Sequence, residues 1–494
     1  MAEGLPSRLA TRRITRWETV MPGRVAGSGS RRLDEGATMK PIPLAAGHPV
    51  LGAALDLRRD TAGTFLRAQR AYGDVVRFRL GPPGLNKEFV GVFSPEGVRQ
   101  ILGTEATSFR KDNIFYEEVR AAVGNGLLTS QDEDYRRQRR LVQPLFTRER
   151  VQSYDTLIVE EAQAAVERWG ASPGGVADVF TMANRLILRI VGQILFGEDA
   201  NAFVDEVRRT FPVINEHARR RAMSPLSVPR SWPTPANRRA TAARRDLYTV
   251  CDRIIAARRP ENTPSERRGE DMLSLLTGQA DQETAPTDKE LRDQLLVFLL
   301  AGHDTTAFAL GCSLHLIARH PENQDRAREE IEHVLAGRPP RTGDLAHLPH
   351  LTGVVKEVLR LYPPAPVIGR RTAEDVQVQG HPIPAGTDVL VSPWVTHRRF
   401  EDWPDPERFD PGRFTPQLEA ARARYAWFPF GGGPRACIGQ GLAMLELVLI
   451  LATVLSAFRI TAVDEQLRLA QGVTLRSVGP GRCRLTELRG ETAA

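Results

Sequence analysis

The feature that most constrains this chain is a cysteine in a glycine-rich loop that runs directly into an apolar helix. Residues 430–439 read Phe-Gly-Gly-Gly-Pro-Arg-Ala-Cys-Ile-Gly. Glycines let the backbone turn tightly and approach a flat ligand closely. Free N–H groups and the helix dipole favour a thiolate at Cys437, and Arg435 can reach a carboxylate on the same ligand. A thiolate beside an arginine in an apolar pocket suits an axial haem ligand, so the loop predicts a haem site.

The ordinary interpretation of a lone cysteine is a buried structural thiol. This spacing, however, would arise by chance in a chain of this composition with a probability of about 10⁻⁵. It resembles the haem-binding loop of the cytochrome P450 family. The resemblance implies haem b with Cys437 as its axial thiolate, and it places Phe430, Gly431 and Gly439 at the cofactor.

Two other segments carry the resemblance. Glu357-Val358-Leu359-Arg360 matches the family's Glu-x-x-Arg helix, and the i, i+3 spacing puts both charges on one face. Alone, such a pair is an ordinary solvated ion pair. Two segments offer a third partner: the resemblance assigns Arg413, in residues 411–414, rather than Arg408, in residues 406–409. It implies that Glu357, Arg360 and Arg413 are structural residues that hold the core around the haem.

The stretch Asp288 to Arg319 predicts one helix about 48 Å long that is apolar nearly all round in its middle. Residues 301–306, Ala-Gly-His-Asp-Thr-Thr, resemble the family's oxygen-activation segment. Ala301 and Gly302 would leave room over the metal. Asp304 and Thr305 would deliver protons, and the Thr305 hydroxyl can donate to the i−4 carbonyl and open the helix. The alternative is a helix kink with a capping Asp-Thr pair. His303 is expected to face solvent or a hydrogen-bond network.

Haem carboxylates need cations, and the resemblance assigns this role to Arg139 and Arg370 beside Arg435. Tyr135 stands where the family usually has tryptophan, and its hydroxyl could donate a hydrogen bond there. Arg371 is not expected to take part. The alternative for all of these arginines is ordinary surface charge.

Composition narrows the class of protein. The 494 residues are 41% hydrophobic and 26% charged, a globular balance. Of the net charge of +7, +3 lies in residues 1–39, and the remaining field is too weak to suggest nucleic-acid binding. Four scattered cysteines give no disulfide framework and suit a reducing compartment, the cytoplasm. The apolar stretches Leu295 to Gly302 and Leu447 to Leu455 fall short of a bilayer span, so we expect no membrane anchor.

The pattern predicts a mainly α protein: a basic disordered tail over residues 1–39 and one catalytic domain over 40–494, a large helical part with a small β-rich region. Residues 260–290 are expected to form an exposed loop. Two β-pairs are predicted, 75–80 with 89–93 and 376–379 with 387–391. Helices are predicted over 162–169, 181–195, 247–257, 288–319, 321–335, 351–361 and 439–457.

The resemblance covers roughly residues 40–488 and implies a haem-thiolate monooxygenase that inserts one oxygen atom of O2 into a hydrophobic small molecule. No flavin or iron–sulfur module is readable, so electrons would come from an external ferredoxin with its reductase. An acidic ferredoxin is expected to dock around Arg435 and residues 136–140. We expect a monomer.

By family position the substrate pocket would include residues 113–115, 211–225, 298–301, 367–368 and 473–474. These are mostly apolar, which favours a terpenoid, fatty acid or polyketide intermediate of secondary metabolism. Three other functions stay open: an isomerase, dehydratase or peroxygenase of the same superfamily, a haem-based sensor or carrier, and a haem-free structural protein.

Overall fold

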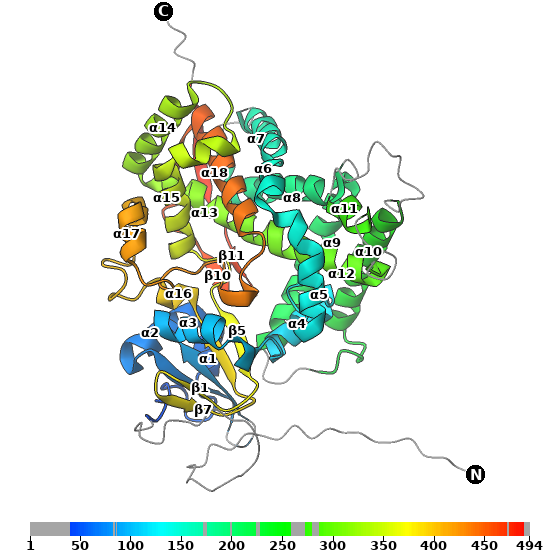
Figure 1. Ribbon diagram of the computed structural model, residues 1–494, viewed down its shortest axis with the longest axis vertical. Coiled ribbons are helices and arrows are strands. Elements are labelled where there is room, and N and C mark those ends of the chain that lie inside the picture. Colours follow the sequence, from blue (N-terminus) through cyan, green and yellow to red (C-terminus); the bar gives the residue numbers. More distant parts are fainter. Residues whose placement is uncertain are drawn as a thin grey trace, which may run out of the picture. The chain divides into compact units, whose positions relative to one another are not determined.

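A computed structural model describes residues 40–82, 84, 86–170, 175–197, 200–223, 228–257, 272–278, 286–471 and 474–488. The predicted tail, residues 1–39, lies outside the described residues. From Lys40 onward the contacts form a single unit. Helices dominate this unit and small sheets gather beside them (Figure 1), so the predicted fold class is confirmed.

Most of the described chain is helical. In chain order the α-helices are α1 (Ala54–Arg59), α2 (Thr61–Tyr72), α3 (Pro95–Arg99), α4 (Ile114–Val123), α5 (Asp132–Val142), α6 (Arg148–Gln152), α7 (Asp155–Gly170), α8 (Val179–Phe196), α9 (Ala200–Met223), α10 (Pro235–Ala257), α11 (Met272–Gly278), α12 (Asp288–Leu299), α13 (Thr305–Arg319), α14 (Pro321–Leu335), α15 (Pro349–Leu361), α16 (Pro393–Thr396), α17 (Pro416–Ala421) and α18 (Gln440–Ala457). Tighter or wider helical turns occur at η1 (Gln100–Thr104), η2 (Ala106–Ser108), η3 (Gln143–Phe146), η7 (Leu300–Asp304), η8 (Thr342–His347), η9 (Pro411–Phe414) and η10 (Gly433–Arg435).

The strands form four small sheets. They are β1 (Val75–Leu80), β2 (Lys87–Val92), β3 (Phe109–Arg110), β4 (Val176–Asp178), β5 (Ile368–Thr372), β6 (Val376–Val378), β7 (His381–Ile383), β8 (Asp388–Val391), β9 (Phe458–Ala462), β10 (Leu469–Gln471), β11 (Leu475–Ser477) and β12 (Arg482–Glu487). The largest sheet has the order β1-β2-β8-β5-β3, and the others are β4-β12-β9, β10-β11 and β6-β7. The predicted pairing of 75–80 with the following strand is present, with Val75 opposite Val92.

Two expectations about local structure were wrong. Residues 376–378 do not pair with 388–391; β6 pairs with β7 instead, and β8 lies between β2 and β5. Positive φ angles at Gln379 and Gly380 reverse the chain directly after β6, so the nearest following strand becomes its partner. Within the expected loop 260–290, residues 272–278 form the buried helix α11, because Met272, Leu273 and Leu276 pack into the core. Residues 258–271 and 279–285 lie outside the described residues.

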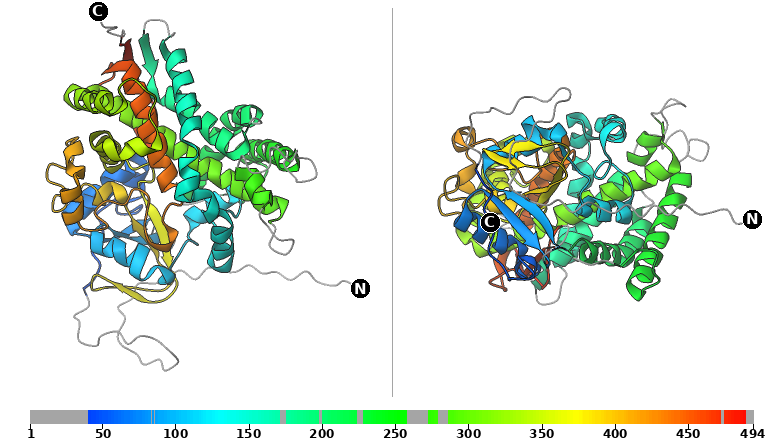
Figure 2. Two further views of the ribbon diagram at one scale, coloured as in Figure 1. Left: turned by 45° about the horizontal axis from the view of Figure 1, so that its top comes forward. Right: turned by 90° about the horizontal axis from the view of Figure 1, so that it is seen from below.

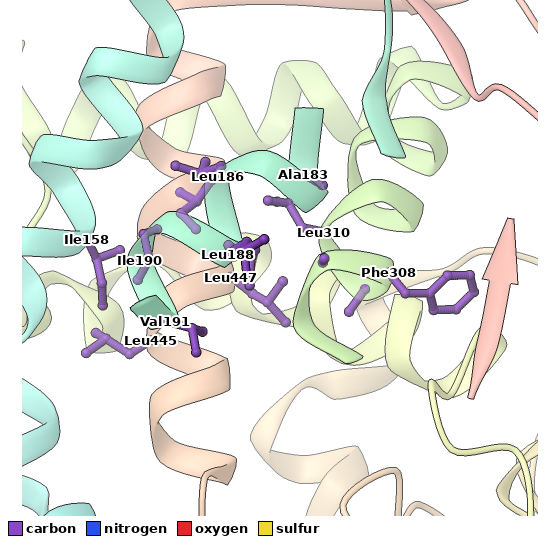
Figure 3. Close-up of a cluster of buried hydrophobic side chains, with 14 of the residues drawn as sticks. Ile158, Ala183, Leu186, Leu188, Ile190, Val191, Phe308, Leu310, Leu445 and Leu447 are labelled. Carbon is purple, nitrogen blue, oxygen red and sulfur yellow. The ribbon is translucent and has the colours of Figure 1, made fainter. Parts of the chain in front are cut away.

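Four helices build the core that carries the site. Figure 3 shows side chains of α8 packed between those of α7, α13 and α18, and the orange-red helix α18 lies among the cyan and green helices from other sides as well (Figure 2). Figure 3 labels Ile158, Ala183, Leu186, Leu188, Ile190, Val191, Phe308, Leu310, Leu445 and Leu447. Because the cysteine loop leads into α18 and the oxygen-activation segment leads into α13, the core fixes where they meet.

Among the described residues, three helical segments are long and apolar enough to cross a membrane, so these segments are longer than the apolar stretches expected from the sequence. They are 179–196, 288–319 and 440–457. Within their most apolar windows, 67%, 78% and 61% of the residues are buried inside the protein. Their apolar surface is therefore largely covered by other parts of the chain.

Candidate functional site

The cysteine loop is closed by its own backbone and packed against neighbouring segments. The Cys437 N–H donates to the Phe430 carbonyl at 2.9 Å. Gly431 and Gly433 have φ angles of +70° and +65°, which side chains rarely adopt. A Cβ at Gly433 would lie 1.7 Å from the Leu102 carbonyl oxygen. The glycines therefore serve both the turn and close contact with the protein, not only an approach to a ligand.

The loop borders a cavity of about 330 Å³ that also reaches the long helix. Phe430, Gly431, Cys437 and Gly439 line this cavity. Burial raises the pKa of the Cys437 thiol, and the Gly439 N–H, with Arg139 and Lys111, partly reverses the shift. The helix terminus thus acts in the expected direction but does not outweigh burial. A bound metal deprotonates a coordinating thiol outright, which supplies the remaining bias.

Four cations line the same cavity: Lys111, Arg139, Arg370 and Arg435. All four donate to backbone carbonyls, Arg139 over the longest distance. The Lys111 ammonium lies 3.3 Å from the Leu128 oxygen, and guanidinium nitrogens of Arg370 and Arg435 lie 2.8 Å and 2.9 Å from those of Gly369 and Ser130. Arg139 has long contacts of 3.4 Å to the Ala436 carbonyl and the Tyr135 hydroxyl.

No carboxylate of the described residues pairs with these four cations. The acids nearest in the sequence or the sheet, Asp112 and Asp388, pair with Arg110 and Arg371. Burial lowers the pKa of Lys111 well below its usual value, and the charges of Arg370 and Arg435 lower it further. Burial likewise lowers the pKa of Arg435 to about 10. Buried side chains of like charge need counter-ions. The site therefore fits a ligand that carries carboxylates, such as haem b.

Tyr135 uses its hydroxyl within the protein. It donates to the Pro434 carbonyl at 2.6 Å, and the Arg435 guanidinium carbon lies 3.3 Å from the centre of its ring. The expected hydrogen bond to a haem carboxylate is therefore replaced by a contact that holds the loop and Arg435. Arg435 is half-buried by this packing, so it is not the exposed docking residue expected from sequence.

The long helix runs without interruption from Asp288 to Arg319, the bounds predicted from sequence, and Thr287 caps it with a reciprocal Thr–Glu290 hydrogen-bond pair. Its turn Leu300–Asp304 is widened to a π-helix. The Thr305 hydroxyl donates to the Ala301 carbonyl at 2.5 Å, the i−4 bond that the sequence suggested.

The structure separates the two proton-delivery candidates. Ala301, Gly302 and Thr305 line the cavity, whereas Asp304 does not. The Asp304 carboxylate accepts a hydrogen bond from the Thr474 hydroxyl. Burial raises the pKa of Asp304, and Thr474 and Arg476 partly reverse this. Sequence reasoning placed Thr474 in the pocket but missed its bond to the acid, because the two residues lie 170 positions apart.

His303 is buried, contrary to a solvent-facing position, and it does not line the cavity. Its burial lowers the pKa of the imidazole to about 4, so the ring is neutral at physiological pH.

In the expected structural network Glu357 and Arg360 are fully buried, and Arg413 is partly buried. Arg360 Nε and Nη2 donate to the two oxygens of Glu357 at 2.6 and 2.8 Å. Arg413 Nε lies 3.4 Å from Glu357, while Arg408 contributes only its carbonyl, to Arg360. His397 accepts from the Phe428 N–H at 2.9 Å and contacts the Arg360 carbonyl, and so connects this network to the start of the cysteine loop.

The expected substrate pocket is placed in part. Phe115, Phe298, Val367 and Ile368 line the main cavity, but Asn113 caps α4 through the Tyr116 N–H. The face of α9 expected there turns toward α4 and α10, where Ile214, His217 and Ala218 line a separate cavity of about 130 Å³. The periodicity of α9 could not reveal which neighbour each face meets. Residues 224–225 and Val473 lie outside the described residues.

Two cavity residues were missed in the sequence. Lys111 could have been noticed only weakly, because lysine is rare in this chain, with five lysines among 67 cationic side chains. The structure shows that Lys111 is buried. Glu446 on α18 gave no signal in the sequence, because it is a single acid in an otherwise apolar stretch. It is 2% exposed, and its Oε1 has no hydrogen-bond partner among the described residues.

Comparison with known proteins gives consistent results. The cytochrome P450 family model matches residues 42–478. The chain is 36% identical over 418 residues to a cyclooctat-9-en-7-ol 5-monooxygenase of Streptomyces melanosporofaciens, which covers 84% of this chain and 88% of that protein. It is also 36% identical to a pentalenene oxygenase of Streptomyces avermitilis, with 84% and 90% covered.

Solved structures agree with the sequence relatives. The crystal structure of the cytochrome P450DA heme domain superposes with a TM-score of 0.81 at 25% identity. The alignment covers 91% of this chain and 98% of that chain.

Proposed function

This chain belongs to the cytochrome P450 family, and on that premise we propose that it oxidises a neutral terpenoid, a cyclic hydrocarbon or a simple alcohol derived from one. The chain is a haem-thiolate monooxygenase with haem b held by Cys437. The haem, when bound, supplies O2 activation and electron acceptance, while the protein supplies orientation, proton delivery and the thiolate.

The chemistry of the cavity wall carries the substrate proposal. Its charged side chains are Glu446 and the four cations described above. We assign the four cations to the cofactor carboxylates. The other lining side chains are apolar or carry a hydroxyl, as Thr305 and Thr474 do. Such a wall offers no counter-ion for an ionised substrate and favours a neutral apolar one. Two relatives whose names denote cyclic terpenoid oxidation support the same class.

We assign the haem carboxylates to Lys111, Arg139, Arg370 and Arg435, because these cations share one cavity and pair with no carboxylate of the described residues. Tyr135 then acts as a support for Arg435. Phe430, Gly431 and Gly439 pack beside the thiolate, and Ala301 with Gly302 leaves space on the long helix for O2.

We assign proton delivery to Thr305 and Asp304. Thr305 lines the cavity and holds a proton on Oγ1, which it now donates to the Ala301 carbonyl. Asp304 lies one residue away in the widened turn and can relay a proton between solvent and this hydroxyl.

The monooxygenase needs an external redox partner, and we propose a ferredoxin with its reductase, acting in the cytoplasm on a monomeric enzyme. Helix α5 presents Arg136, Arg137 and Arg140 at the surface, while Arg139 of the same helix faces the Cys437 loop. The exposed arginines would therefore bring an acidic partner close to the thiolate side.

A binding and turnover assay tests the substrate class. The purified holoenzyme is titrated with neutral cyclic sesquiterpenes and diterpenes, and with long-chain fatty acids as ionised controls of similar apolar area. We expect the terpenes to shift the Soret band and to gain one oxygen atom from ¹⁸O2 with a surrogate ferredoxin system. Fatty acids should bind at least about 10-fold more weakly, since the wall gives their carboxylate no partner.

Tighter binding and oxidation of the fatty acids would contradict the proposal. Rearranged terpene products without ¹⁸O would indicate an isomerase. Binding of O2 or CO without any turnover would favour a sensor or carrier.

A further inference from the structure

One hydroxyl joins the substrate cavity to the proton-relay acid. Thr474 lines the cavity and is buried, at 8% exposed, and its hydroxyl donates to Asp304 Oδ2. Asp304 itself does not line the cavity. The carboxylate of Asp304 is thus bound to a residue of the cavity wall, although Asp304 itself lies outside that wall.

Thr474 lies between the two strands of a hairpin, directly before the second strand, and this hairpin makes further contacts. Strands β10 and β11 pair with Leu469 opposite Ser477, and the Leu475 N–H donates to the Pro364 carbonyl at 2.8 Å. Arg476 follows Thr474 by two residues and lies in β11. Its guanidinium lies 3.4 Å from Glu216 on α9, and its charge also acts on Asp304.

We propose that Thr474 is a positioning residue that holds the Asp304 carboxylate away from Thr305, and that a substrate contacting Thr474 releases the acid to relay protons. The hairpin would then couple the filling of the cavity, and the position of α9, to proton delivery. The proposal deepens the function proposed above and rests on it.

The charges around Asp304 agree with this role. The groups that act on its carboxylate are the Thr474 hydroxyl and Arg476, and the adjacent His303 is neutral because of its burial. Glu216 on α9 pairs with Arg476. Burial raises the pKa of Asp304, and Thr474 and Arg476 partly reverse this shift by favouring the ionised form. Once released, the carboxylate takes a proton from solvent, passes it toward Thr305 and returns to its ionised form.

The test compares Thr474→Val, which keeps the shape but removes the donor, with Thr474→Ser, which keeps the donor. We expect Thr474→Val to lower product formed per NADPH consumed by about 3- to 10-fold and to change the solvent deuterium isotope effect on kcat. The substrate Kd, from the Soret shift, should change less than about 3-fold. Thr474→Ser should restore coupling. In an Asp304→Asn background Thr474→Val should have little further effect on coupling.

A second readout needs no substrate. The infrared band of the protonated Asp304 carboxyl, identified by its loss in Asp304→Asn, is titrated in the holoenzyme. Thr474→Val should move this titration to higher pH, because the ionised form loses its hydrogen bond, and Thr474→Ser should not. If the wild type oxidises no terpenoid, the proposed function fails, but this titration still decides whether Thr474 controls Asp304.

The α9 contact has a matched control. Arg476→Gln should also move the Asp304 titration upward, and Glu216 keeps Arg220 as a partner at 2.7 Å, so the fold should persist. Arg459→Gln removes an arginine of the same 46% exposure that pairs with Asp325, and it should leave the titration unchanged. An unaltered Asp304 titration and unaltered coupling in Thr474→Val would overturn the proposal and leave Thr474 as a plain wall residue.

Discussion

Single residues decide the chemistry of this cavity. The informative ones are charged side chains without an oppositely charged partner among the described residues. The role of Cys437 was visible in the sequence because the glycines and the arginine around it are chemically specific. Lys111 was not, because its role depends on Arg370 and Arg435, which come from distant segments. The same reason hid the bond between Thr474 and Asp304. Sequence patterns show which groups are present. Cations that pair with no carboxylate of the described residues show what kind of ligand must bind between them.

Glu446 yields a prediction about stability. Burial raises the pKa of this carboxyl to about 8, well above the value of about 4.3 of an unfolded chain. Between these values the folded state binds the proton and the unfolded state does not. The free energy of unfolding should therefore fall as pH rises, by on the order of 1.4 kcal/mol per pH unit from this group, and level off above about pH 8.

Glu446→Gln should remove this contribution, so the variant gains stability over the wild type as pH rises from 5 to 8. Urea unfolding of both holoproteins at several pH values measures the difference. Glu332→Gln, at an exposed position of α14, is the control and should track the wild type. A constant difference between Glu446→Gln and wild type across this range would contradict the prediction.

At the scale of elements, the long helices were predictable, whereas only one of the two predicted strand pairings is present. The bounds 288–319 and 321–335 agree with the structure because apolar residues recur with the helical period and caps mark the ends. The partner of β6 depended instead on a turn at Gln379 and Gly380. Short strands carry little pattern, and one turn residue redirects them.

The crossing of α8 and α13 gives a second prediction. A Cβ at Gly311 would lie 2.4 Å from the ring of Phe180, closer than real Cβ atoms come. Gly311→Ala should destabilise the protein by about 1–3 kcal/mol, even though alanine favours helices, because the two helices must separate.

Gly441→Ala is the matched control. This glycine also lies in a helix, α18, but a Cβ there meets nothing within 4 Å. The substitution should stabilise by about 0.5–1 kcal/mol through helix propensity. Thermal unfolding of both holoproteins checks the pair, and an equal response of the two variants would rule out the packing argument.

At the scale of the whole molecule, the chain presents one basic helix next to the thiolate loop. The overall architecture followed from a few spaced motifs, because only one family combines them. Which side chains are exposed could not be predicted in the same way. Arg435 was expected at the surface, yet it packs on Tyr135 at the cavity. Exposure depends on tertiary neighbours, which leaves Arg136 and Arg140 of α5 as docking candidates.

Charge reversal tests that docking site. Arg136→Glu with Arg140→Glu should slow reduction by an acidic ferredoxin by on the order of 10-fold at low salt, with a smaller effect at high salt. Stopped-flow reduction measures it. Arg326→Glu on α14, which lies far from α5 in Figure 1, should have little effect. Equal rates in the α5 variant and the wild type at low salt would place docking elsewhere.

The cluster of four like-charged side chains also bears on how the polypeptide matures. Before haem binds, the chain must hold these mutually repelling side chains close together in a poorly solvated cavity. Their repulsion opposes closure of the surrounding segments. Ligand uptake removes that opposition and pulls the folding equilibrium forward by mass action. The supply of porphyrin during synthesis, as much as the chain itself, therefore governs how much finished enzyme a cell accumulates.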